Sequence, residues 1–327
     1  MSSLYIDRQN VQLDYDSGAI VFREAGQRIG TVALAGVTRV VLRGSATLPA
    51  SLLGRIGAAG AGVVILSGRR AQPTLMLSRP HSDARRRIAQ VRLALEAAFC
   101  LQFARGLVRE KIAGHRSLLD ELRPAHPAAR RPLTSAMQAL DAHLASLDAA
   151  ASLAALRGIE GAAASAWFAA LRAVLPASLG FAGRNRRPPR DPFNALLSLS
   201  YTLAGAELAL ALHGSGLDAA IGYYHQPSHA RHSLACDLLE PLRPRIDRFC
   251  LRLIARQTLS AEHFCTSAAN GCLLGKAGRS HYYNAWERSA APALRRAISA
   301  QVQQLLQTIA PAMPALLPER EDEETDI

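Results

Sequence analysis

The sequence lacks the features that would place a protein in a membrane or outside the cell. No uninterrupted apolar run reaches about 18 residues, so we predict no membrane span. The N-terminus, M-S-S-L-Y-I-D-R, has no basic stretch followed by an apolar one, so we predict no secretory signal. The five cysteines are odd in number, and none forms a C-x-x-C pair: Cys100, Cys236, Cys250, Cys265 and Cys272. They predict buried thiols in a reducing cytoplasm, not a disulfide framework or a zinc site.

Acidic residues are scarce outside the C-terminus. Lys plus Arg number 38 and Asp plus Glu 26, which gives a net charge of +12. Residues 319–326 hold six of the acids and one Arg, so residues 1–318 carry +17. A body this basic favours a polyanionic partner, with nucleic acid the first candidate. The alternative is that arginine enrichment follows from a GC-rich genome, which the high alanine content also suggests.

The chain divides into two regions of different composition. Residues 1–77 consist of short runs dense in β-branched and aromatic residues, separated by turns such as D-S-G and E-A-G, with one short helix expected at 49–60. Residues 78–85 (S-R-P-H-S-D-A-R) break the periodicity and predict a linker. Residues 86–318 are rich in Ala and Leu with helical spacing, so we predict an α+β protein with a small β domain and a larger all-α domain.

Loops and the C-terminal tail complete this outline. Loops are expected near residues 122–132, 183–192 and 226–230, and no internal repeat is visible. The acidic tail at 319–327 is expected to be disordered, because six acids in eight residues cannot bury anything. With 49% apolar residues, the rest of the chain is expected to fold around a real core.

The first stretch that could carry a catalytic or binding residue is residues 158–168, G-I-E-G-A-A-A-S-A-W-F. Glu160 lies among glycines and alanines, on a helix face small enough for another backbone or a ligand to approach. The alternative is a solvated or capping carboxylate, which is the commoner role of a single Glu.

The second stretch is an arginine-rich loop followed by a helix. Four arginines fall within seven residues, in a loop stiffened by two prolines: Arg184, Arg186, Arg187 and Arg190. A helix is predicted to begin at Asp191, with Pro192 in its first turn. Arginine forks beside a helix N-terminus suit phosphate oxygens, although a solvated loop is an equal alternative. Asn194 and Tyr201 on that helix are candidates for orienting DNA or for supporting, from behind, the side chains that contact it. The alternative is that they only pack the helix.

The third stretch is residues 221–245, where His225 precedes a turn and Ser233 opens a helix. Asp237 and Glu240 are three residues apart and therefore share a helix face. An imidazole and two carboxylates meeting Glu160 would bind a hard divalent cation, Mg²⁺ or Mn²⁺. Each part alone is a weak signal, because D-x-x-E on a helix is common and a single His is usually structural.

Taken together, the three stretches resemble the CRISPR-associated integrase-endonuclease, the universal Cas protein of spacer acquisition. The matching segments are G-I-E-G at 158–161, F-A-G-R-N-R-R-P-P-R-D-P-F-N-A-L-L-S-L-S-Y-T-L at 181–203, G-Y-Y-H at 222–225 and S-L-A-C-D-L-L-E-P-L-R-P at 233–244. R-I-A-Q from Arg87 and V-R-E-K-I from Val108 also look like the family, so the resemblance covers nearly the whole chain.

The resemblance implies a function. It implies metal ligands at Glu160, His225 and Glu240, with Asp237 as a further acidic catalytic residue one helical turn before Glu240. It also implies a homodimer formed through the β domain, and an integration complex with a small second CRISPR-associated protein. Such a complex inserts a captured prespacer into the CRISPR repeat array of double-stranded DNA by attack of a 3′-hydroxyl on a phosphodiester, a reaction of antiviral defence.

The residues agree with this chemistry and leave two alternatives open. Transesterification conserves phosphodiester bond energy, and no G-x-x-x-x-G-K-[ST] nucleotide loop is present. One alternative is a hydrolase, a metal-dependent nuclease acting on branched DNA; the other is a non-catalytic nucleic-acid-binding scaffold. Pro241 directly follows Glu240 and disfavours helical geometry there, so we expect Glu240 at a kink and still predict it, not Asp237, as the ligand.

Overall fold

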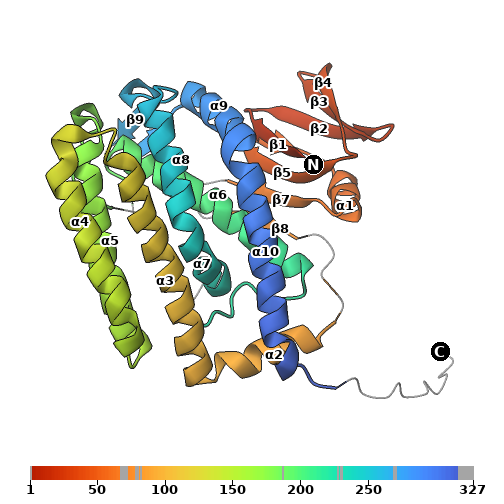
Figure 1. The fold of residues 1–327 in the computed structure, drawn as a ribbon. Helices are drawn as coiled ribbons and strands as arrows, with labels where there is room; N and C mark the ends of the chain where they lie inside the picture. Colours follow the sequence, from red (N-terminus) through yellow and green to blue (C-terminus); the bar gives the residue numbers. More distant parts are fainter. Residues whose placement is uncertain are drawn as a thin grey trace.

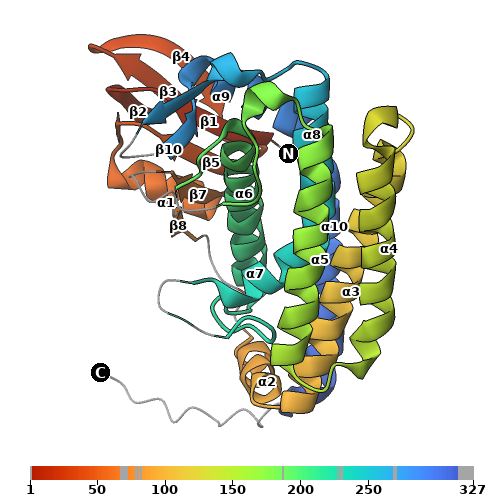
Figure 2. The ribbon, with the colours of Figure 1, turned by 90° about the vertical axis from the view of Figure 1, so that its left-hand side faces the viewer.

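The computed structural model places a β-rich region at one end of an elongated helical body (Figures 1 and 2). It describes residues 2–66, 73–77, 81, 83–185, 188–226, 228, 231–267 and 271–315. Helix α2 lies at the end of the body opposite the strands, and α10 runs between the two ends (Figure 1).

The N-terminal region contains two four-stranded sheets. The first has the order β1-β5-β7-β8, with β1, β5 and β7 parallel and β8 antiparallel; the second has the order β4-β3-β2-β6. Their elements are β1 (Ser2–Asp7), β2 (Val11–Asp16), β3 (Ala19–Glu24), β4 (Gln27–Ala33), β5 (Val37–Arg43), β6 (Ala46–Thr47), α1 (Ala50–Ala58), β7 (Gly62–Ile65) and β8 (Thr74–Met76).

The first sheet is buried on both faces, which explains its continuous apolar runs. Side chains alternate along a strand, so neighbouring residues point to opposite faces. On β5, Val40 packs into the small core that includes α1 and the second sheet, whereas Val41 packs into the large helical core. Val63 and Val64 on β7 divide in the same way. The sheet therefore joins the two regions instead of closing off a separate domain.

The remainder of the chain is mostly helical. Its α-helices are α2 (Arg85–Ala94), α3 (Ala97–Leu122), α4 (Arg130–Ser146), α5 (Leu153–Val174), α6 (Pro192–Gly214), α7 (Ser233–Leu239), α8 (Arg243–Ala255), α9 (Lys276–Ala285) and α10 (Ala291–Ile309). A hairpin of β9 (Phe264–Ser267) and β10 (Gly271–Leu274) interrupts them. Short helical turns cover Pro127–Ala129, Leu147–Ala149, Ala177–Leu179, Glu240–Leu242, Ala261–His263, Trp286–Ala290 and Ala310–Ala312.

Helix α6 is the central element of the helical body. It contacts α7, α8, α10 and β10, and most of its residues are buried. By length and composition it is apolar enough to cross a membrane, with a mean hydropathy of 1.6 over its most apolar 18 residues, but 67% of that window is buried inside the protein. Its N-terminus forms as the D-P dipeptide predicts: the Asp191 side chain accepts a hydrogen bond from the Asn194 N–H at 2.9 Å.

A buried cluster of charges ties the β-rich region to the helices. We call Tyr5, Arg39, Glu207, Glu287 and Arg295 the interdomain ion cluster. Arg39 Nη1 on β5 and Arg295 Nη2 on α10 both donate to Glu207 Oε1 on α6, each at 3.0 Å. Arg295 Nη2 also donates to Glu287 Oε1 at 2.7 Å, and the Tyr5 hydroxyl donates to the same oxygen at 2.8 Å. Because Glu207 is only 3% exposed, the cluster fixes the sheet against α6 and α10.

The predicted fold class is confirmed, with local differences. The region predicted to be all-helical also holds the β9–β10 hairpin, and helix α2 begins at Arg85, inside the expected linker. The loop expected at 122–132 is shorter, because a helical turn begins at Pro127 and α4 at Arg130. Residues 78–80 and 82 of the linker, and the acidic tail at 319–327, lie outside the described residues.

Candidate functional site

Asp237 organises one side of the candidate site. It lies on α7 and is completely buried. Its Oδ2 accepts hydrogen bonds from the backbone N–H groups of Tyr223 at 2.7 Å and Tyr224 at 3.0 Å. Its Oδ1 accepts one from the N–H of His225 at 2.8 Å and pairs with His225 Nδ1 at 2.7 Å. Residues 223–225, which lie between α6 and α7, therefore all bind this single carboxylate through their backbone.

The close approach of this loop requires glycine at position 222. A Cβ at Gly222 would lie 2.8 Å from Asp237 Oδ2, 2.8 Å from the His225 carbonyl oxygen and 2.9 Å from the Ser233 carbonyl carbon. Two of these neighbours are backbone atoms that cannot rotate away. The glycine that opens the G-Y-Y-H segment thus allows the next three backbone N–H groups to reach Asp237.

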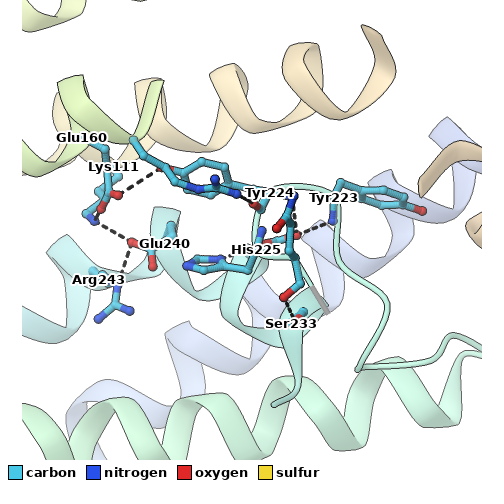
Figure 3. A network of polar contacts seen from close by, with 11 residues as sticks. Lys111, Glu160, Tyr223, Tyr224, His225, Ser233, Glu240 and Arg243 are labelled. Carbon is cyan, nitrogen blue, oxygen red and sulfur yellow. Dashed lines mark hydrogen bonds and ion pairs between the residues drawn. The ribbon is translucent and has the colours of Figure 1, made fainter. Parts of the chain in front are cut away.

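The pairing with Asp237 sets the tautomer of His225. An ionised carboxylate only accepts hydrogen bonds, so the neutral form of the ring carries its proton on Nδ1 and has its lone pair on Nε2. This carboxylate–histidine arrangement is the one that metal-binding histidines usually have. The ring extends toward the Glu240 carboxylate (Figure 3), so the Nε2 lone pair is available on the side where the glutamates lie.

Glu160 and Glu240 meet at a lysine on a third helix. Lys111 Nζ on α3 lies 2.6 Å from Glu240 Oε2 and also contacts Glu160 Oε1 on α5 (Figure 3). The Tyr224 hydroxyl donates to the other oxygen, Glu160 Oε2, at 3.1 Å. Burial, reinforced by the Glu160 charge, raises the pKa of Tyr224, so the hydroxyl stays protonated as a donor.

The backbone at Glu240 differs from the kink expected from Pro241. Its φ and ψ are −57° and −48°, which is helical, and Glu240 opens a 3₁₀ turn directly after α7. The proline preference was outweighed because the chain continues from α7 through this turn into α8. Glu240 is 3% exposed, and Arg243 Nε donates to its Oε2 at 2.8 Å. Burial alone would raise the pKa of Glu240, but Arg243 and Lys111 hold it well below its usual range.

The side chains of Glu160, His225 and Glu240 are of the types that bind a hard divalent cation, but they are not already grouped around one empty point. Among the residues that the structure describes, no three His, Cys, Asp or Glu side chains already form a group able to hold a metal. The two glutamates instead share the positive charge of Lys111. Two carboxylates and an imidazole nitrogen are ligands that Mg²⁺ and Mn²⁺ accept.

The arginine loop is fastened from inside the protein. Asn194 is fully buried; its Oδ1 accepts from Arg184 Nη1 at 2.8 Å and from the Asn185 N–H at 3.1 Å. Its Nδ2 donates to the Gly183 carbonyl at 2.8 Å and to Asp191 Oδ2 at 2.6 Å. The structure thus gives Asn194 the packing role that was the alternative to DNA contact.

The remaining DNA-binding candidates are placed differently from one another. Tyr201 is 8% exposed and donates its hydroxyl to Asp247 Oδ1, so it too is a core residue and not a surface contact. Arg190 is exposed, whereas Arg184 is half-buried and also reaches Ser198 Oγ at 3.2 Å. Arg186 and Arg187 lie outside the described residues.

A groove of about 560 Å³ runs along α5 from the residue next to Glu160. It lies between α5 and the start of the arginine loop. Small residues form much of its wall, and two arginines and an aromatic ring supply its charge and stacking surface: Gly161, Ala164, Phe168, Arg172, Gly183 and Arg184. Such a combination suits a nucleic-acid strand, because arginine binds phosphate and an aromatic ring stacks on bases.

The residues that support the site from behind were not predicted from the sequence. Lys111 was noticed only within V-R-E-K-I, and Arg243 only within a longer matching segment. Asp247 on α8 is fully buried; its Oδ2 pairs with His115 Nε2 and accepts from Trp167 Nε1, each at 3.0 Å. Helical spacing offered a signal: Lys111 and His115, like Arg243 and Asp247, are four residues apart and share a helix face.

The fold and this site define a basic protein whose β-rich end is joined to a helical body with a carboxylate–histidine centre. The family model described as CRISPR associated protein Cas1 matches residues 4–288. The CRISPR-associated endonuclease Cas1 1 of Thermodesulfovibrio yellowstonii is 34% identical over 290 residues, covering 88% of this chain and 91% of the relative. The Cas1 3 protein of Thermus thermophilus is 33% identical, covering 80% of this chain and 76% of the relative. The chain therefore belongs to the Cas1 family.

Solved structures show the same fold. A Cas1 protein from Thermotoga maritima aligns with a TM-score of 0.83 at 19% identity, over 98% of this chain and all of the other. A casposase bound to an integration product aligns with a TM-score of 0.81 at 19% identity, over 100% of this chain and 96% of that one. A chain of a Cas6-RT-Cas1–Cas2 complex aligns with a TM-score of 0.80 at 23% identity, over 95% of this chain and 35% of that chain.

Proposed function

We propose that this Cas1 family protein is a divalent-metal-dependent integrase of CRISPR adaptation. It joins the 3′-hydroxyl of a captured prespacer to a phosphodiester of the CRISPR repeat. The observation that carries the proposal is that Glu160 and Glu240 both contact the Lys111 ammonium. Beside them lies His225, whose Nδ1 pairs with Asp237. The same arrangement would serve an endonuclease reaction, the activity in the names of the two Cas1 relatives described above.

Each residue of the site has a role in this proposal. Glu160, His225 and Glu240 would hold Mg²⁺ or Mn²⁺, which when bound supplies Lewis-acid polarisation of a phosphate oxygen. Asp237 keeps the His225 ring in the tautomer that presents Nε2, and Arg243 aims the Glu240 carboxylate.

The joining step exchanges one phosphodiester for another. A bond forms between the 3′-oxygen and phosphorus, and the bond from phosphorus to the 3′-oxygen of the target strand breaks. The attacking hydroxyl gives up its proton and the leaving oxygen takes one, so no net charge is created and no nucleotide cofactor is consumed. Holding two DNA strands in line is then the main task of the protein.

The surface supplies places for the DNA. The groove along α5 begins at Gly161, next to Glu160, and includes Arg172 and Arg184, so we propose that it receives a single strand. The exposed Arg190 would extend this basic region. The charge of +17 on residues 1–318 supports duplex binding that weakens as salt rises.

The proposed partners are inferred from the second sheet, which contains β4, and from the partners of related proteins. Strand β4 is exposed along nearly its whole length, with Ile29 44% exposed, so we propose that a second copy of the chain covers this sheet. A small second CRISPR-associated protein is proposed as the other partner, because a solved relative lies in a Cas1–Cas2 complex. We place this assembly in the cytoplasm, where the array and the reduced thiols would both be found.

A joining assay tests the proposal. The protein, its small partner and a fork-ended duplex are mixed with a supercoiled plasmid carrying the repeat, with Mg²⁺, with Mn²⁺ or with a chelator. Nicked plasmid joined to the duplex, formed only with metal, is the expected product. Shortened fragments without joined product would indicate the hydrolytic nuclease, and DNA bound in chelator but never altered would indicate the scaffold.

A further inference from the structure

The cation between the two glutamates is one of only two lysines in the chain. Of the 38 basic residues, 36 are arginines; the lysines are Lys111 and Lys276. Lys276 is exposed at the start of α9, whereas Lys111 is 6% exposed on α3. A chain that uses arginine at almost every basic position keeps lysine at the one buried position between Glu160 and Glu240.

The shapes of the two side chains explain this choice. A guanidinium is a wide, planar fork that spreads its donors over several positions: Arg295 reaches Glu287 through Nη1 and Glu207 through Nη2, and Arg243 reaches Glu240 Oε2 through Nε at 2.8 Å. An ammonium is a compact point charge that two carboxylates can share from different directions. Lys111 Nζ is shared in this way by Glu240 Oε2, at 2.6 Å, and Glu160 Oε1. A divalent metal held by the same two oxygens would need that same place.

We infer that Lys111 is a positioning residue that occupies the cation position of the metal-free site and is displaced when the divalent cation binds. The inference rests on the metal dependence proposed above. In the metal-free protein the ammonium offsets the repulsion between two largely buried carboxylates and keeps both aimed at one point. Metal entry then requires movement of one flexible side chain, while Glu160 and Glu240 stay in place. The affinity for metal is lowered in return, because the metal must displace Lys111 from its ion pairs with Glu160 and Glu240.

A spectroscopic experiment observes the displacement directly. With lysine labelled at 13Cε and 15Nζ, the wild-type chain gives side-chain signals from two residues only, and exposed Lys276 is an internal control. Titration with Mg²⁺ is expected to shift the Lys111 signals in step with binding measured by calorimetry and to leave those of Lys276 unchanged. A Lys111 signal that stays fixed while Mg²⁺ binds would overturn the inference.

Variants test the competition. Lys111→Met should bind Mn²⁺ about tenfold or more tightly than wild type, the value of one charged hydrogen bond, whereas Lys276→Met should bind as wild type does. Lys111→Met should also melt at a lower temperature than wild type in chelator, with the gap closing in Mn²⁺. Lys111→Gln gives the same comparison if the Met variant does not fold. Unchanged or weaker Mn²⁺ affinity, or an equal loss of melting temperature with and without metal, would contradict displacement.

The outcomes separate this inference from the proposed function. If wild type binds Mn²⁺ and the Lys111 variants bind it no better, displacement is wrong and metal dependence stands. If wild type itself binds neither Mg²⁺ nor Mn²⁺, the metal dependence fails and the inference fails with it.

Discussion

The carboxylates of the site differ in whether their oxygen atoms already accept hydrogen bonds from the protein backbone. The Asp237 carboxylate accepts four hydrogen bonds from the loop that carries His225, so both of its oxygens are occupied inside the protein. Glu160 and Glu240 instead turn oxygens toward a cation. This difference separates the glutamates, which would contact a metal, from Asp237, which holds His225 in place.

The first prediction compares these residues in the joining assay. Glu160→Ala, His225→Ala and Glu240→Ala should each abolish joining, whereas Asp237→Asn should reduce it by about 10–100-fold, the usual cost of losing an outer partner of a metal ligand. DNA binding should remain near wild type in all four. Glu110→Ala, at an exposed position beside Lys111, is the matched control and should join normally. A dead Asp237→Asn protein together with an active Glu240→Gln protein would reverse the two assignments.

The second prediction concerns acid sensitivity from His115. Burial lowers the pKa of this ring below its ordinary value, so the folded protein holds His115 neutral where the unfolded chain binds a proton. The unfolded state therefore takes up more protons below about pH 6.5, and the free energy of unfolding should fall as the pH drops through that range. Denaturant melts between pH 8 and 5 should show a flatter profile for His115→Gln. His143→Gln, half-buried on α4, should keep the wild-type slope.

Among the larger elements, the β9–β10 hairpin supports the arginine loop. The Cys272 N–H donates to the Pro189 carbonyl at 2.7 Å, which joins the start of β10 to the loop. Gly271 has a φ of +66°, and a Cβ there would lie 2.3 Å from the same carbonyl oxygen. Both the backbone angle and the contact therefore require glycine.

The third prediction follows from this contact. Gly271→Ala should lower the free energy of unfolding by about 1–3 kcal/mol or more, because it adds backbone strain and pushes on Pro189. It should also weaken DNA binding by moving the arginine loop. Gly205→Ala is the control, since its Cβ would meet nothing within 4 Å in the middle of α6, and it should be neutral or slightly stabilising. Unchanged stability in Gly271→Ala would show that the hairpin does not hold the loop.

Elements were predictable from the sequence where local chemistry decides them. The D-P dipeptide at 191–192 predicted the start of α6, and the β-branched runs predicted most of the strands. Pro241 misled the prediction at Glu240 because a local preference was outweighed by the continuing turn into α8. Helical spacing places Lys111 on one face with His115, and Asp247 on one face with Arg243, but the roles of Lys111 and Asp247 come from contacts with other helices far apart in the chain.

At the scale of the whole molecule, the β-rich region and the helical body share a hydrophobic core and the interdomain ion cluster. Val41 and Val64 of the first sheet lie in the helical core, and Glu207 pairs with arginines from both regions. The composition change near residue 78 predicted a domain boundary. It did not reveal that the two sides are packed into one another.

The fourth prediction is that the protein unfolds in one transition. A calorimetric melt should give a single peak, because separating the regions would expose the face of the first sheet that bears Val41. Glu207→Gln should cost about 3–5 kcal/mol, the usual penalty for leaving a buried charge without its partner. Glu110→Gln, exposed and outside the cluster, should change little. Two resolved peaks, with the smaller lost in a protein lacking residues 1–77, would show independent domains.

Helix α6 also has a consequence for how the chain is made. As it leaves the ribosome it is an apolar segment of 23 residues whose neighbours α8 and α10 have not yet been synthesised. The last residue of α10 follows the end of α6 by 95 residues, which translation at about 5–20 residues per second adds in about 5–20 s. For that interval the future centre of the protein is open to chaperones and to aggregation. Conditions that lengthen this interval, such as rare codons, would therefore be expected to lower the yield of soluble protein.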